Sequence, residues 1–187
     1  MTVDATIRAS RHHLIRWGTQ GLCALAFAIM GITLAGLLSA PAGIAATATL
    51  LPSGDAIELK GEGAGASFKT TMPVHRSGGI RYFSAGVGLE ERQAEYPPFS
   101  LKLILVAGPK AYLSKVGVTI TNDSGTVRVD IPGDDVDGPW LFVDLPDGTY
   151  HIEAVSRGDQ VEQGGVRVSG GKMRTVYLRW PRAPELF

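Results

Sequence analysis

The sequence is poor in cysteine and histidine, with one cysteine and four histidines among its 187 residues. Cys23 lies in an apolar N-terminal stretch that we expect to be removed, so the remaining domain has no disulfide and must depend on an apolar core. That domain keeps two histidines, His75 and His151. Because structural zinc sites use cysteine and histidine ligands, the sequence cannot assemble one of the usual kind, and we expect no cofactor.

The sequence also lacks an excess of charge of either sign, with 18 acidic and 18 basic residues. Removing residues 1–46 takes away three basic residues and one acidic residue, which leaves 15 against 17. A protein that binds nucleic acid needs a basic face to contact the phosphates. The charge balance therefore argues against a nucleic-acid partner.

The N-terminal segment has the three parts of a secretory signal peptide. Three arginines come first, the most apolar part spans 22–38, and small residues follow it. We expect residues 1–46 to form a signal helix that is removed on export. Cleavage after Ala45, Ala46 or Ala48 fits the small residues equally well.

An uncleaved signal anchor is the alternative. Residues 22–38 are just long enough to cross a bilayer core of roughly 30 Å. The arginines would then stay in the cytoplasm, and the C-terminal domain would lie outside. Both interpretations predict an exported domain in the periplasm or cell envelope, which contacts a membrane only through the N-terminal segment.

Residues 47–98 are rich in glycine and show little periodicity. We expect a flexible, irregular region here, with one strand around residues 56–59. Residues 77–92 predict a structured loop, because each glycine in a helix costs about 1 kcal/mol relative to alanine. A short helical turn is expected at residues 89–94.

From Phe99 onward, apolar residues alternate with polar ones at period two, which is typical of strands with one buried face. Turn sequences such as Asp147-Gly148 separate these segments at short intervals. No helical pattern intervenes, so we expect antiparallel strands in two packed sheets, with a single closed barrel as the alternative. The seven predicted strands are 101–105, 116–120, 127–129, 141–143, 150–154, 166–168 and 176–180.

The most specific motif is L-P-D-G-T-Y at residues 145–150. With the strands around it, this motif resembles the carboxypeptidase regulatory-like domain, a transthyretin-like (prealbumin-like) β-sandwich. The resemblance implies an all-β, antiparallel, seven-stranded Greek-key β-sandwich of the immunoglobulin or transthyretin class over residues 99–182, with 183–187 as a tail. Pro146 and Gly148 would set the turn, and the Tyr150 ring would point inward.

Members of that family usually carry this domain as an accessory module beside an enzyme or transporter. Residues 77–92 are in addition similar to part of small secreted proteobacterial proteins that contain the domain alone. The resemblance therefore implies a non-catalytic exported module that binds a protein or another envelope component. Such a short motif supports a fold better than a function.

No catalytic arrangement is apparent in the sequence. Ser67 lacks the second glycine of a nucleophile elbow, and the Ser-x-x-Lys match at 169–172 lies in a predicted hairpin turn instead of a helix. The transthyretin-like hydroxyisourate hydrolase ends in Tyr-Arg-Gly-Ser, which is missing here. We expect no enzyme; a hydrolase is the alternative, and a cleft shared by His75 and Glu90 or Glu91 would favour it.

An acidic loop could supply oxygen ligands to calcium, but its residues lack the order of an EF-hand, and a polar hairpin loop is the simpler interpretation. The acidic residues are Asp130, Asp134, Asp135 and Asp137.

The candidate interaction surface combines a charged cluster beside glycine turns with the acidic loop and one tryptophan. Trp180 follows the inward alternation of its strand, so Trp140 is the better surface aromatic. A carbohydrate-binding module that stacks a sugar on Trp140 is therefore the alternative to a protein-binding module. The candidate residues are Glu90, Glu91, Arg92, Asp135, Asp137 and Trp140.

Overall fold

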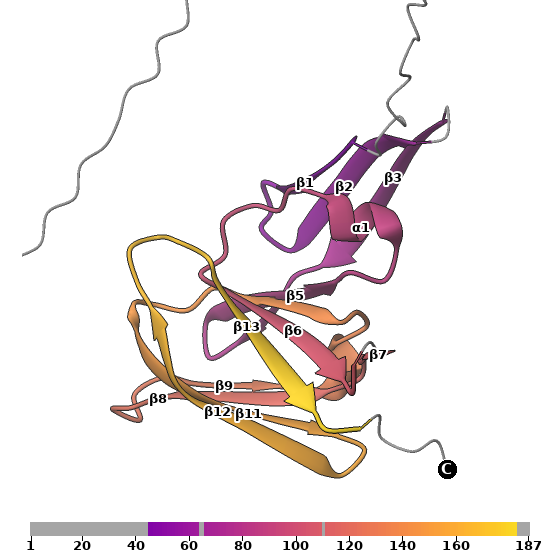
Figure 1. The fold of residues 1–187 in the computed structure, drawn as a ribbon. Coiled ribbons are helices and arrows are strands. Elements are labelled where there is room, and N and C mark those ends of the chain that lie inside the picture. Colours follow the sequence, from indigo (N-terminus) through magenta and orange to yellow (C-terminus); the bar gives the residue numbers. More distant parts are fainter. Residues whose placement is uncertain (1–44, 64–65, 110, 183–187) are drawn as a thin grey trace, which may run out of the picture. The chain divides into compact units, whose positions relative to one another are not determined.

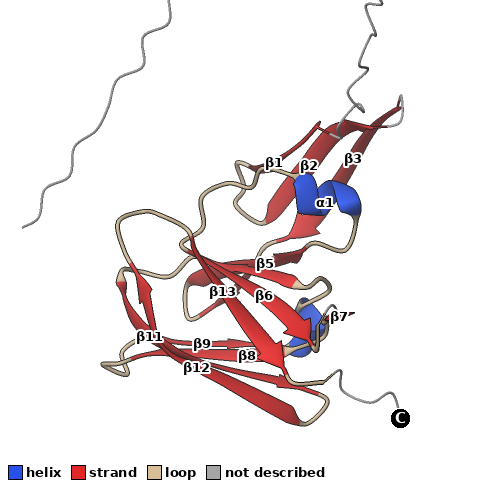
Figure 2. Ribbon diagram, viewed as in Figure 1, coloured by secondary structure: helices blue, strands red, loops and turns tan. Residues whose placement is uncertain are grey.

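The computed structural model describes residues 45–63, 66–109 and 111–182 (Figure 1). The apolar segment 22–38, nearly all of the predicted leader and the tail 183–187 lie outside these ranges. Among the described residues, no helix is long and apolar enough to cross a membrane. The described chain is predominantly β, as predicted (Figure 2).

Each of the seven segments predicted from period-two alternation overlaps a strand. The turn at 169–172 likewise links two strands, and its two glycines have positive φ of 69° and 65°. The strands are β6 (Leu101–Ala107), β8 (Gly117–Asn122), β9 (Arg128–Ile131), β10 (Trp140–Val143), β11 (Gly148–Ser156), β12 (Asp159–Val168) and β13 (Arg174–Trp180).

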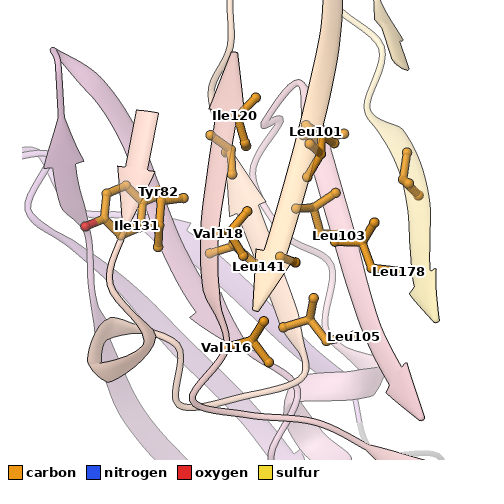
Figure 3. Close-up of a cluster of buried hydrophobic side chains, with 14 of the residues drawn as sticks. Tyr82, Leu101, Leu103, Leu105, Val116, Val118, Ile120, Ile131, Leu141 and Leu178 are labelled. Carbon is orange, nitrogen blue, oxygen red and sulfur yellow. The ribbon is translucent and has the colours of Figure 1, made fainter. Parts of the chain in front are cut away.

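Two sheets enclose the larger core. The four-stranded sheet has the order β12-β11-β8-β9. The central sheet has the order β13-β6-β10-β5-β4, with β5 spanning Ile80–Ala85, β4 spanning His75–Ser77, and the short β7 (Ala111–Tyr112) paired with β6. Alternate residues of each strand point into the space between the sheets, where leucine, isoleucine and valine side chains face one another (Figure 3).

One strand pair departs from the predicted antiparallel arrangement. β13 lies parallel to β6, with Arg174 opposite Leu101 and Trp180 opposite Ala107. The alternation of side chains is the same in parallel and antiparallel strands, so the sequence pattern could not distinguish the two. The last strand follows β12, the edge strand of the other sheet, and joins the central sheet beside β6.

The interpretation of residues 47–98 as irregular is wrong. Three antiparallel strands, β1 (Ala45–Leu50), β2 (Ala56–Gly63) and β3 (Ala66–Pro73), form an N-terminal sheet. β4 and β5 belong to the central sheet, and all of β5 lies within the predicted loop at 77–92. The short helix α1 (Leu89–Gln93) confirms the predicted helical turn.

A second core explains why β5 escaped prediction. Tyr82 points into the larger core, whereas Phe83 points to the opposite side, where it stacks on Phe142 at 4.6 Å between ring centroids. A strand that is buried on both faces has no alternation of apolar and polar residues. Residues of the N-terminal sheet, including Ile57 and Leu59, complete this second core.

Strand β1 bears on the predicted cleavage positions. Ala46 and Ala48 are buried in the second core, at 7% and 5% exposure. The Ala48 N–H donates to the Glu95 carbonyl at 2.9 Å, and the Glu95 N–H donates to the Ala46 carbonyl at 3.2 Å. Cleavage after Ala48 would remove both hydrogen bonds and cleavage after Ala46 would remove the one to Ala46, whereas cleavage after Ala45 would leave both in place.

The Tyr150 ring points inward, as predicted, whereas Gly148 lies at the start of β11 instead of in the turn. Tyr150 is buried, and its hydroxyl donates to the Pro146 carbonyl at 2.8 Å. A Cβ on Gly148 would lie 3.3 Å from the Tyr150 ring, so the ring packs directly on this glycine. Trp180 is also buried, as expected, and its indole N–H donates to the Asp159 carbonyl at 3.0 Å.

Candidate interaction surfaces

The six candidate residues belong to three different parts of the chain. Glu90, Glu91 and Arg92 belong to α1. Asp135 ends the 3-10 helix η1 (Gly133–Asp135), and Asp137 follows it. Trp140 begins β10.

Glu91 acts within the fold. Its carboxylate accepts hydrogen bonds from the backbone N–H groups of Gly86 at 2.6 Å and Val87 at 3.0 Å. The Tyr96 hydroxyl donates to the Glu91 carbonyl at 2.9 Å, and burial raises the pKa of this tyrosine, so that it remains a donor. Glu91 therefore holds the loop that connects β5 to α1.

A groove of about 420 Å³ lies between α1 and the N-terminal sheet. Glu90 is half-buried at its rim, and within the described ranges its carboxylate has no ion pair or hydrogen bond. The lining residues are Leu59, Ala66, Ser67, Phe68, Thr70, Glu90 and Glu91.

Asp135 links η1 to the central sheet through a hydrogen bond with Tyr82 of β5. The buried Tyr82 hydroxyl donates to its carboxylate at 2.7 Å. Burial, and then the negative charge of Asp135, raise the pKa of Tyr82, so the hydroxyl stays protonated. His75 stacks on the Tyr82 ring, and its Nδ1 lies 3.6 Å from the same carboxylate. His75 is thus grouped with Asp135, and it is not among the residues that line the groove of Glu90 and Glu91.

The other acidic residues of the predicted loop point to different partners. Lys115 donates from its Nζ to the Asp137 carboxylate at 2.6 Å, whereas Asp130 accepts from Arg128 and Thr119. No group of three or more histidine, cysteine or acidic side chains in the described part of the chain could hold a metal ion.

The Trp140 indole is packed against neighbouring residues of the fold. The Lys102 Nζ lies 3.2 Å from the indole centroid, and a Cβ on Gly86 would lie 3.0 Å from the same ring. The Tyr96 ring meets it edge-on at 6.4 Å. The half-buried indole already has these neighbours, which leaves little of the ring for a sugar to stack on.

A surface that the sequence analysis missed lies on the outer side of β6, away from the larger core. Two exposed tyrosines, Tyr177 at 59% and Tyr112 at 54%, stand opposite Ile104 and Val106 on neighbouring strands. Ile104 and Val106 are shielded, yet they belong to neither core cluster. We call this surface the aromatic face; it comprises Arg92, Ile104, Val106, Tyr112, Tyr177 and Arg179.

The arginines complete the aromatic face. The Arg92 guanidinium lies over the Tyr112 ring, 5.9 Å from its centroid. Arg179 stands opposite Val106 and donates to the Gly108 carbonyl at 2.6 Å. One signal was present in the sequence, because Tyr177 and Arg179 occupy the outward positions of β13, where solvent-facing residues are expected.

Lys102, whose ammonium lies over the Trp140 ring, should make the stability of the protein depend on pH. Burial lowers the pKa of Lys102 to about 8, so the unfolded chain binds the additional proton between about pH 8 and 10.5. Stability contributed by Lys102 should therefore rise with pH across that window. In the unsubstituted protein we expect the free energy of unfolding to rise by on the order of 1 kcal/mol across this window, and in Lys102→Met we expect no such rise. The expected rise is kept small because the side chain is partly exposed and the Trp140 ring attracts the ammonium group. Urea unfolding of both proteins at pH 7.5, 8.5 and 9.5 measures this; parallel profiles would contradict it.

Among the described residues, neither serine considered from the sequence is hydrogen-bonded to a histidine or a carboxylate. Ser67 is exposed on β3, and its hydroxyl makes no hydrogen bond to a histidine or carboxylate of the described chain. Ser169 lies between β12 and β13 with glycines after it.

Comparison with known proteins gave no match to a protein-family model, a curated protein or a solved structure.

Proposed function

We propose that this chain is a non-catalytic, exported accessory module of the periplasm or cell envelope that binds a protein partner through its aromatic face. The proposal includes the finer fold, a carboxypeptidase regulatory-like, transthyretin-like Greek-key sandwich of β6 to β13, with β5 and β4 added to its central sheet. The inward Tyr150 ring and the core between the two sheets support that assignment.

The aromatic face is the observation that carries the proposal. Tyrosine and arginine are enriched at protein interfaces and among the residues that dominate binding energy. Here Tyr112 and Tyr177 are exposed on either side of the shielded Ile104 and Val106. Exposed aromatic rings with cationic neighbours are the arrangement expected of a protein-binding patch.

The carbohydrate-binding alternative has less support. A sugar-binding tryptophan needs an open ring face, and Trp140 is in contact with Lys102 and Gly86. Asp137, its proposed neighbour in such a site, is paired with Lys115.

Substitutions in the aromatic face test the proposal. The immobilised full chain would first capture a partner from an envelope extract, and the dissociation constant of the purified pair would then be measured. We expect Tyr177→Ala and Tyr112→Ala each to weaken binding about thirtyfold, or ~2 kcal/mol, because each removes a large exposed ring from the contact.

Val155→Ala is the matched control for these variants, because Val155 is 43% exposed on the four-stranded sheet, away from the aromatic face. It should bind like the unsubstituted protein. Undiminished binding by the folded double variant Tyr112→Ala/Tyr177→Ala would contradict the proposal, as would a captured ligand that is a glycan.

A further inference from the structure

Strand β3 has an unpaired backbone edge. It lies at the end of the N-terminal sheet and pairs with β2 alone. The Val74 N–H donates to the Asp55 carbonyl at 2.8 Å, so even-numbered residues of this segment bond toward β2. Ser67, Lys69 and Thr71 therefore direct their N–H and C=O groups outward, and no other described segment pairs with them.

The opposite edge of the same sheet is covered. Ala46 and Ala48 of β1 bond to Glu95, which runs beside that edge. An open row of N–H and C=O groups is a template for another strand. β3 is the edge of this sheet where such pairing is possible.

The groove beside α1 lies next to this open edge. Phe68 and Thr70 of β3 and Leu59 of β2 line it, and Glu90 and Glu91 of α1 form its acidic rim. A peptide strand added to β3 would direct alternate side chains to the face that carries Phe68 and Thr70. Those side chains would enter the groove.

Charge decides which peptide fits. The Glu91 carboxylate is occupied by the backbone of Gly86 and Val87, whereas that of Glu90 has no partner among the residues described. If the added strand were a second copy of β3, it would direct Phe68 and Thr70 toward the groove, and it would bring no positively charged side chain to Glu90. A lysine or arginine from a different chain would supply the missing charge.

We propose that the free edge of β3 binds an extended peptide of another protein by strand addition, with an apolar side chain in the groove and a basic side chain at Glu90. The interaction is separate from the aromatic face. It rests on the open backbone of β3, the groove and the unpaired carboxylate.

Fluorescence anisotropy with labelled synthetic peptides tests the backbone part. The probe alternates threonine with valine, leucine and one central lysine, and it is titrated with the full chain. Ser67→Pro removes one outward N–H without removing a bond to β2, and proline is tolerated at such edge positions. We expect Ser67→Pro to weaken binding at least tenfold relative to Ser67→Ala, which keeps the N–H.

A charge exchange tests the specificity. Glu90→Lys should bind the lysine peptide at least tenfold more weakly and should prefer the same peptide with glutamate in place of lysine. Glu95→Lys, an exposed change outside the groove, is the matched control and should keep the original preference.

Three outcomes would overturn the inference. They are equal binding by folded Ser67→Pro and Ser67→Ala, an unchanged preference in Glu90→Lys, and light scattering that shows a dimer lost in Ser67→Pro, which would assign the edge to a second copy. Tyr177→Ala should leave peptide binding unchanged, so a failure here is distinguishable from a failure of the proposed function.

Discussion

Gly138→Ala is expected to destabilise the protein by about 3 kcal/mol or more, because there is no room for a methyl group at this position. A Cβ on Gly138 would lie 2.2 Å from the carbonyl oxygen of Ala85 and 2.6 Å from its carbonyl carbon. Both are backbone atoms of β5, so the clash cannot be relieved by rotating a side chain. The Gly138 N–H also donates to the Ser84 hydroxyl at 2.8 Å, which holds the two segments together.

Urea unfolding followed by tryptophan fluorescence measures this effect. Gly164→Ala is the matched control, since its Cβ would meet only the His151 ring at an ordinary 3.4 Å. We expect that control to change stability by no more than about 0.5 kcal/mol. Equal unfolding midpoints for the two variants would contradict the close approach of Gly138 to β5.

Phe142→Ala is expected to cost about 3–5 kcal/mol, because it removes the ring at the centre of the second core. Phe142 is fully buried, stacks on Phe83 and contacts Tyr96 at 4.7 Å between centroids. The loss should also loosen the N-terminal sheet, so amide exchange in β1 to β3 should accelerate more than in the four-stranded sheet.

Phe142→Leu separates the role of volume from that of the aromatic ring. It keeps most of the buried apolar surface, and we expect a loss of about 1–2 kcal/mol. A loss below about 1 kcal/mol for Phe142→Ala would contradict the second core, as would uniform exchange across all sheets.

Both variants concern contacts that the sequence pattern did not show. The strands that were predicted, such as β8 and β11, have one face in the core and one in solvent, and this produces the period-two pattern. β5 is covered on both faces and β1 buries small alanines, so the sequence pattern predicts a loop for the first and a cleavage region for the second.

The candidate interaction residues likewise have contacts that the sequence pattern does not show. Glu91 and Trp140 have the residue types expected of a binding surface, but the fold uses Glu91 to hold a loop and surrounds Trp140 with Lys102 and Gly86. The aromatic face joins Tyr112 to Tyr177, which are far apart in the sequence. Only the pairing of β7 and β13 with β6 brings them together.

The sequence by itself determined the all-β class, the approximate positions of seven of the eight strands from β6 onward, and the inward Tyr150 ring after the turn before β11. These features depend on alternation and turn chemistry between residues that are close along the chain. Only the tertiary structure decided the parallel pairing of β13, the second core, the open edge of β3 and the aromatic face. Each of these depends on which distant segments lie side by side, and local residue patterns carry no information about that choice.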